Sequence, residues 1–148
     1  MTPLRILLAL CLTTLAPLAA AADDAQAVRD LIGATFDTPH AKVASDPVIV
    51  EQDYAIANWV QGEKGGRALL RRKDGKWNIT LCAGDWLKQA DNMGKAGVPA
   101  DAAAKLAQRL NEAESRLTPE QRAQFSRFKP EQAAANHAGH TDRHGSHH

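Results

Sequence analysis

The sequence predicts an α+β fold, a small four-stranded antiparallel meander packed by an N-terminal helix and followed by C-terminal helices. Three observations support this prediction. An apolar stripe at helical spacing runs through residues 27–36, four short apolar segments between turn residues follow it, and a second helical stripe covers residues 106–117. The 148 residues are enough for one domain.

The N-terminus has the pattern of a secretory signal peptide. Arg5 precedes a nearly unbroken apolar run over Ile6–Leu18, and three alanines at 20–22 supply a small-residue cleavage site. We therefore expect a signal peptide over residues 1–22, a single domain over 23–130, a flexible His-rich tail over 131–148, and a protein soluble after cleavage. An uncleaved anchor is the alternative, whereas Leu10 before Cys11 argues against a lipid-anchored form.

The elements of the predicted domain follow in order along the chain. Val28, Leu31 and Ile32 lie on one face of a short amphipathic helix. Residues 62–66 are rich in glycine and predict a turn between the second and third strands. The expected helix and strands span Asp24–Thr35, Pro47–Glu51, Tyr54–Gln61, Arg67–Lys73 and Lys76–Cys82.

Asp74-Gly75 is a strong hairpin signal, because a two-residue type I′ turn needs positive φ at both positions. This turn predicts the facing pairs Lys73/Lys76, Arg72/Trp77, Leu70/Ile79, Ala68/Leu81 and Arg67/Cys82. A second turn centred on Lys64-Gly65 would place Trp59 opposite Leu70. Because side chains alternate along a strand, the expected core face, covered by the first helix, carries Trp59, Leu70, Trp77, Ile79 and Leu81.

Two helices are predicted after the sheet. The first begins near Pro99 and buries a stripe of Leu106, Leu110, Ala113 and Leu117. The second begins at 118–121, where the sequence TPEQ combines an N-cap threonine, proline at N1 and glutamine at N3. This last helix should run to about Phe128, with Phe125 and Phe128 facing inward.

Composition excludes some classes of function. The chain carries 18 basic and 17 acidic residues, and a nucleic-acid-binding protein would usually be more basic. The sequence has no nucleophile elbow, zinc-protease motif, phosphate loop or Cys-x-x-Cys pair. We therefore expect a protein that is not an enzyme and does not bind nucleic acid.

The strongest chemical signal is the C-terminal segment NHAGHTDRHGSHH. Short His-rich tracts are typical of metal binding, and imidazole suits copper(II), nickel(II) and zinc(II), with copper(II) favoured on an unconstrained nitrogen site. The alternative is a solvated tail or a remnant of cloning. The expected metal ligands in this segment are His137, His140, His144, His147 and His148.

Cys82 is the second candidate, as the single cysteine left after signal cleavage. A neighbouring Arg67 would favour its thiolate, and together with Met93 it could hold copper(I). The alternatives are a buried, inert thiol or a disulfide to another chain. His40 is expected to be a surface or capping residue, and Asp85 a turn residue.

Four stretches resemble one family. They are residues 28–39 (VRDLIGATFDTP), 53–77 (DYAIANWVQGEKGGRALLRRKDGKW), 81–87 (LCAGDWL) and 96–99 (AGVP), which are similar to small exported bacterial proteins described as copper uptake system-associated. The resemblance implies a periplasmic role in copper acquisition or delivery, alongside copper-handling periplasmic proteins or a transporter. The meander with one packing helix is also similar to cystatin-like and nuclear-transport-factor-2-like folds.

The leading hypothesis is therefore a periplasmic copper-binding accessory protein, with the His cluster as ligand and Cys82 as a further contributor. A zinc or nickel protein that uses the same tail is the second reading. A small ligand-binding or inhibitory module, with a pocket between sheet and helix lined by Trp59 and Trp77, is the third. A thiol enzyme would need His40 near Cys82 as its base.

Overall fold

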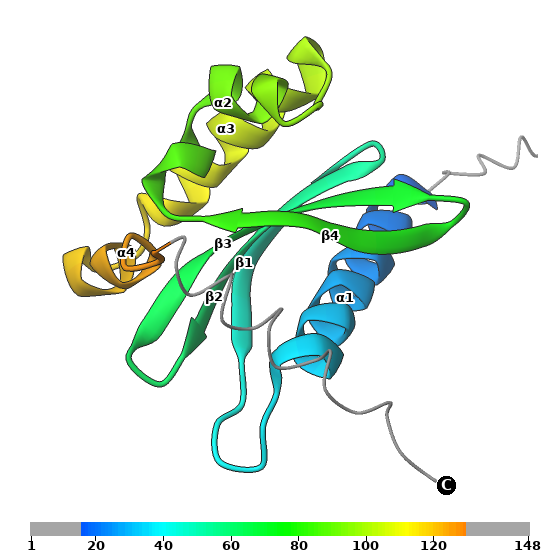
Figure 1. Cartoon of the computed structure of the whole chain (residues 1–148). Coiled ribbons are helices and arrows are strands. Elements are labelled where there is room, and N and C mark those ends of the chain that lie inside the picture. The colour runs from blue at the N-terminus through cyan, green and yellow to red at the C-terminus, as the bar shows by residue number, and fades with distance from the viewer. Residues whose placement is uncertain (1–15, 130–148) are drawn as a thin grey trace, which may run out of the picture.

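The structure, a computed structural model, describes residues 16–129 and confirms the α+β architecture (Figure 1). Residues 1–15, which carry most of the predicted signal peptide, and residues 130–148, which carry the His-rich tail, lie outside the described part. The elements are α1 (Ala16–Phe36), β1 (Ala44–Glu51), β2 (Tyr54–Gln61), β3 (Lys64–Lys73), β4 (Lys76–Ala83), a 3-10 turn η1 (Asp85–Lys88), α2 (Ala90–Lys95), α3 (Ala100–Glu114) and α4 (Pro119–Phe125).

The four strands form one antiparallel sheet in the order β1-β2-β3-β4. The hairpin at Asp74-Gly75 forms as predicted, with φ of 52° and 75° at its two positions. The predicted pairs Lys73/Lys76, Arg72/Trp77 and Leu70/Ile79 are all present. A short local signal was therefore sufficient to set the register of this half of the hairpin.

Beyond Ile79 the predicted register is wrong by one residue. Leu69 pairs with Leu81 and Leu70 with Ile79, so that Thr80 is an extra residue in β4. Such a β-bulge moves every following side chain to the other face. Ala68 therefore faces Cys82 rather than Leu81, and Arg67 faces Ala83 rather than Cys82.

The turn between β2 and β3 also differs from the prediction. It lies at Gly62-Glu63, so that Trp59 pairs with Gly66 and not with Leu70. Gly65 belongs to β3 itself. The glycines serve here to let another segment approach the strand closely, as described below for the C-terminal segment.

α1 covers one face of the sheet, as predicted. Its Val28 and Ile32 pack against Ala55, Ala57, Ala68 and Leu70 of β2 and β3. Four half-buried residues pack against this cluster, namely Trp59, Trp77, Ile79 and Cys82. The bulge places Leu81 against the opposite face. The helix spans Ala16–Phe36 and so extends to the N-terminal side of the predicted Asp24, because alanine is a strong helix former.

A second core, which the sequence analysis missed, fills the opposite face of the sheet. Helices α2 and α3 lie on this side, across the sheet from α1 (Figure 1). Its buried members are Ile49, Ile56, Leu69, Leu87, Met93, Val98, Ala102, Ala103, Leu106, Ala107 and Leu110. The sheet is thus covered on both sides, which explains why consecutive residues, and not alternate ones, are buried in β2 (residues 55–58) and β3 (residues 65–70).

The last helix begins with the predicted capping box. Thr118 accepts from the Gln121 backbone N–H at 3.2 Å, and the Gln121 side chain accepts from the Thr118 N–H at 2.9 Å. α4 ends at Phe125, however, and not at Phe128. The chain then turns, and Phe128 packs edge-on against Trp59 with ring centroids 6.0 Å apart.

Within residues 16–129, no helix combines the length and apolar character that crossing a membrane requires.

Candidate functional site

A buried ionic cluster joins the sheet to the C-terminal helices. Arg67 is 1% exposed and Glu114 is 2% exposed. The Arg67 guanidinium donates from Nε to Glu114 Oε1 at 2.8 Å and from Nη2 to Oε2 at 3.0 Å. The buried Asn58 amide donates to the same Oε1 at 2.7 Å. This two-pronged pair fixes the end of α3 against β2 and β3.

The cluster extends to the surface through Asp85, the first residue of η1. Asp85 Oδ1 accepts from Arg67 Nη1 at 3.0 Å and from Ser126 Oγ at 2.6 Å. The Asp85 side chain is 65% exposed, so that one end of a buried network reaches solvent. Lys88 Nζ lies 3.6 Å from Glu114 Oε2 and completes the cluster.

Both carboxyl groups of this cluster are ionised at neutral pH. Burial raises the pKa of Glu114, but hydrogen bonds from Arg67 and Asn58 and the nearby positive charges outweigh it, so that the net shift is downward. The Ser126 hydroxyl, followed by Arg67, lowers the pKa of Asp85. Asp85 therefore presents a negative carboxylate at the surface.

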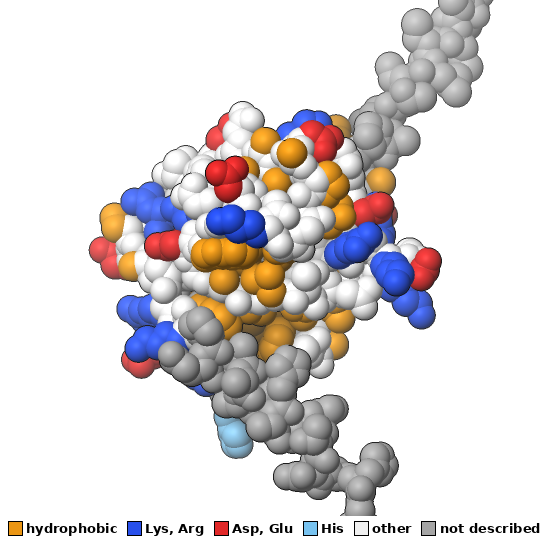
Figure 2. Space-filling view, turned by 45° about the horizontal axis from the view of Figure 1, so that its top comes forward, with side chains coloured by type: hydrophobic (Ala, Val, Ile, Leu, Met, Phe, Trp, Pro, Cys, Tyr) orange, Lys and Arg blue, Asp and Glu red, His pale blue; other side chains and the backbone are white. Residues whose placement is uncertain are grey.

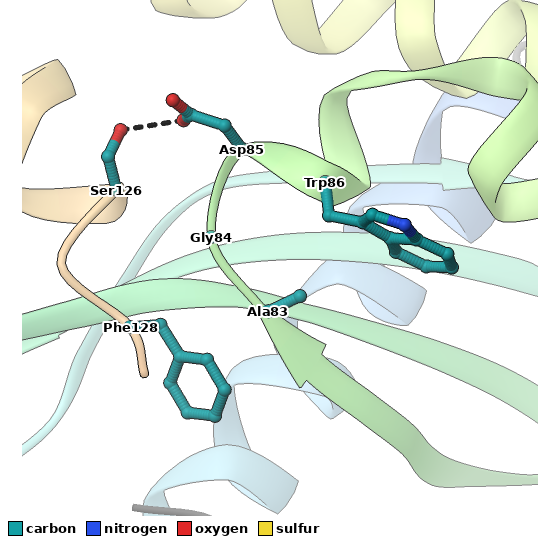
Figure 3. A pocket seen from close by; sticks show the side chains of 6 residues that line it. All are labelled: Ala83, Gly84, Asp85, Trp86, Ser126 and Phe128. Carbon is teal, nitrogen blue, oxygen red and sulfur yellow. Dashed lines mark hydrogen bonds between the residues drawn. The ribbon is translucent and has the colours of Figure 1, made fainter. Parts of the chain in front are cut away.

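An open hollow of about 420 Å³ lies beside Asp85. Its lining comes from the end of β4, from η1 and from the residues after α4, namely Ala83, Gly84, Asp85, Trp86, Ser126 and Phe128. In Figure 3 the Asp85 carboxylate reaches towards Ser126, while the Trp86 indole and the Phe128 ring lie on either side of Gly84. The lining thus combines one fixed carboxylate with two aromatic rings, which Figure 3 shows apart from it. A carboxylate can accept a hydrogen bond from imidazole or guanidinium, and an aromatic face can pack against either group.

Three glycines let the C-terminal segment lie directly on the sheet. A Cβ at Gly65 would stand 2.5 Å from the Gln124 carbonyl oxygen, and one at Gly66 would stand 2.9 Å from Phe128 Cβ. A Cβ at Gly84 would meet the Ser126 carbonyl at 3.3 Å. The wall of the hollow that Ser126 and Phe128 provide is therefore held in place by close backbone contact.

Cys82 does not have the surroundings predicted for it. Its strand neighbour is Ala68, it packs at the edge of the α1-side core, and the Arg67 guanidinium is committed to Glu114 and Asp85 on the other side of the sheet. Burial raises the pKa of the Cys82 thiol to about 11. The expectation of an arginine-stabilised thiolate is wrong.

Met93 is fully buried in the core between the sheet and the C-terminal helices. Cys82 belongs to the core on the opposite face. The structure therefore does not bring the two sulfur ligands proposed for copper(I) together.

The five predicted histidine ligands, His137, His140, His144, His147 and His148, lie outside the described residues. His40 is exposed in the loop before β1. Within residues 16–129, no group of three or more His, Cys, Asp or Glu side chains is placed to hold a metal ion.

The predicted ligand pocket between sheet and α1 can also be compared with the structure. Trp59 and Trp77 are half-buried, and they flank a core filled by aliphatic side chains. The Trp77 indole N–H donates to Asp24 at 3.3 Å. The hollow described above lies instead at the end of β4, and neither of these two tryptophans lines it.

Sequence reasoning missed Glu114 and Trp86, and it gave Arg67 the wrong partner. A signal for Glu114 was present, because it continues the i, i+4 spacing of Leu106 and Leu110 on the buried side of α3. A charged residue at such a position demands a buried partner. Trp86 carries no comparable pattern, since its exposure depends on how η1 leaves the sheet.

Hydrophobic side chains gather near the middle of the molecular face in Figure 2, with charged side chains around them.

No family model, no curated protein and no solved structure matches this chain. Function is therefore inferred from the chemistry of the residues themselves.

Proposed function

We propose that the chain is an exported, copper-binding accessory protein. The His-rich segment 137–148 captures the metal, and the α+β domain carries that segment and presents it to the copper-handling partners. The observation that carries the proposal is the presence of five histidines within these twelve residues, separated by seven residues from the end of the described domain. Several imidazoles on one short segment can converge on one ion, and copper(II) binds such nitrogen sites most tightly among the common divalent metals.

The packing of α1 supports removal of an N-terminal signal after Ala22. Residues 18–23 are exposed, whereas Asp24 is partly buried and hydrogen-bonds to the sheet. Asp24 Oδ1 accepts from Arg72 Nη1 at 2.7 Å and from the Trp77 indole at 3.3 Å. Cleavage after Ala22 would thus leave the helix docking intact and place two aspartates in its first turn, where the helix dipole favours negative charge.

Export has a direct test. The full chain is expressed in a Gram-negative bacterium, and the intact mass of the protein recovered from the periplasm is measured. We expect a mature chain that begins at Asp23. Recovery of the uncleaved chain from the membrane or cytoplasm would contradict this part of the proposal.

Metal binding is tested on the mature chain, purified without a tag or metal column. Copper(II) is titrated calorimetrically into the wild type, into a variant with all five tail histidines replaced by glutamine, and into the matched control His40→Gln. We expect tight binding that His40→Gln leaves unchanged and that the fivefold variant loses by at least 100-fold. Affinity should fall below about pH 6.5, because histidine must be neutral to ligate.

Copper is distinguished from zinc and nickel by biology rather than by affinity, since copper(II) exceeds both on nitrogen ligands. Expression of the native protein should rise when the cell is starved of copper and stay constant when it is starved of zinc. If deletion of residues 136–148 combined with Cys82→Ala leaves copper affinity unchanged, the proposed metal site is wrong.

A further inference from the structure

We propose that the metal-loaded segment 137–148 docks in the hollow between η1 and α4, where Asp85 accepts the N–H of a metal-bound imidazole and Trp86 packs against another part of the same segment. This inference rests on the proposed function and adds a defined place on the domain. It makes Asp85 a positioning residue, because it acts on the metal through a histidine.

The first support is the point at which the chain leaves the domain. Phe128 lines the hollow, and the described residues end at Lys129. Seven residues, 130–136, separate that point from His137. Such a stretch can span at most about 25 Å, so that the histidines are tethered within reach of the hollow. A short tether gives an effective concentration of the order of millimolar, and even weak contacts then suffice for docking.

The second support is the state of the Asp85 carboxylate. Its Oδ1 is occupied by Arg67 and Ser126, whereas none of the described residues donates a hydrogen bond to Oδ2. The two bonds to Oδ1 hold the carboxylate in place while leaving it 65% exposed at the hollow. Histidines that ligate metals regularly donate their second ring N–H to a carboxylate of this kind, which fixes the tautomer and strengthens the metal bond.

The third support is the exposed indole of Trp86. Trp86 is 42% exposed. Among the described residues, Leu18 is the one other large apolar side chain that is exposed. Leu18 lies in the segment that signal cleavage would remove. In the mature chain, Trp86 is then the large apolar side chain that a docked segment would remove from water. Imidazole rings pack well on indole faces, and Phe128 offers a second aromatic surface in the same hollow.

Trp86 also supplies the measurement, because copper(II) quenches the fluorescence of a tryptophan that it approaches closely. Copper(II) is titrated into the mature wild type and into Trp86→Phe, and the emission and calorimetric affinity are recorded together. We expect one equivalent of copper to quench a larger fraction of the emission in the wild type than in Trp86→Phe, which retains Trp59 against Phe128. The quenching should vanish in the variant that lacks the five tail histidines.

Asp85→Asn tests the positioning role, and Asp91→Asn on α2 serves as a matched, exposed control. We expect Asp85→Asn to weaken copper binding by 10–100-fold, as is usual for the loss of such a carboxylate, and Asp91→Asn to have no effect. Urea unfolding of both variants separates this loss from a loss of folding. Zinc(II) titration followed by NMR should shift the backbone amides of Gly84 and Ser126 in the wild type and not in the tail-less chain.

Two results would refute docking while leaving the proposed function intact. One is wild-type copper affinity with equal fractional quenching in Trp86→Phe and wild type. The other is unchanged affinity in Asp85→Asn. Absence of copper binding by the wild-type mature chain would instead refute the proposed function, and docking with it.

Discussion

Removal of the Glu114 carboxylate should destabilise the domain more than almost any other single truncation. Arg67 is 1% exposed, and in Glu114→Ala it loses two of its three hydrogen bonds to carboxylates, while the Asn58 amide loses its acceptor. Stranding a buried charge in this way costs about 3–5 kcal/mol. This is a large share of the roughly 5–15 kcal/mol that stabilises a typical domain.

The assay is urea unfolding of the mature chain at pH 7, followed by circular dichroism. With an m-value of about 2 kcal/mol/M, the midpoint should fall by roughly 2 M. The double variant Arg67→Met/Glu114→Leu is the control, since replacing a whole buried pair by apolar residues is often neutral. A loss below about 1 kcal/mol in Glu114→Ala, or a double variant as unstable as the single one, would refute the reasoning.

The same pair predicts the direction of the pH dependence. The pKa of Glu114 is lowered in the folded chain from its ordinary value of 4.5. A depressed folded pKa contributes stability that is complete above the unfolded value and is lost as the pH falls through the folded one. The stability gap between wild type and Glu114→Ala should therefore be constant from about pH 6 to 8 and should shrink below about pH 4.5.

Three further predictions concern other parts of the domain. Gly65→Ala should cost about 1–3 kcal/mol in urea unfolding, because the new Cβ meets the Gln124 backbone; a neutral result would show that α4 shifts freely. The Cys82 thiol, with a pKa of about 11, should react slowly with iodoacetamide, at a rate that rises about tenfold per pH unit between pH 7 and 9; fast, pH-independent reaction would contradict the assigned burial. Thr118→Ala should lower stability by about 1 kcal/mol through loss of the capping box with Gln121, whereas Thr118→Ser should retain it.

Local signals in the sequence predicted the helices and strands well, but they predicted the register between strands less well. The Asp74-Gly75 turn and the Thr118 cap depend on neighbouring residues alone, and both form as expected. The bulge at Thr80 has no local signature, because an alternating pattern looks the same on either side of an inserted residue. That one residue reversed the predicted faces of Leu81 and Cys82.

Two glycines in β3 also show that contacts distant in the sequence cannot be predicted from neighbouring residues. Gly65 and Gly66 predict a turn when only their neighbours are considered. In the structure both residues lie in β3. They are glycines because α4 and Phe128, some sixty positions later in the chain, occupy the space that a side chain would fill. The candidate hollow depends on this long-range contact, so that the sequence could identify Asp85 as a turn residue but not as its charged edge.

A sheet covered on both faces also determines how the domain opens. β2 and β3 are hydrogen-bonded on both edges and shielded by α1 on one side and by α2 and α3 on the other. Their backbone amides can exchange hydrogen with solvent only when the whole domain unfolds, whereas the outer edges of β1 and β4 exchange through local fluctuations. The slowest-exchanging amides should therefore report the global free energy of unfolding directly, and they belong to the two strands that carry Asn58 and Arg67.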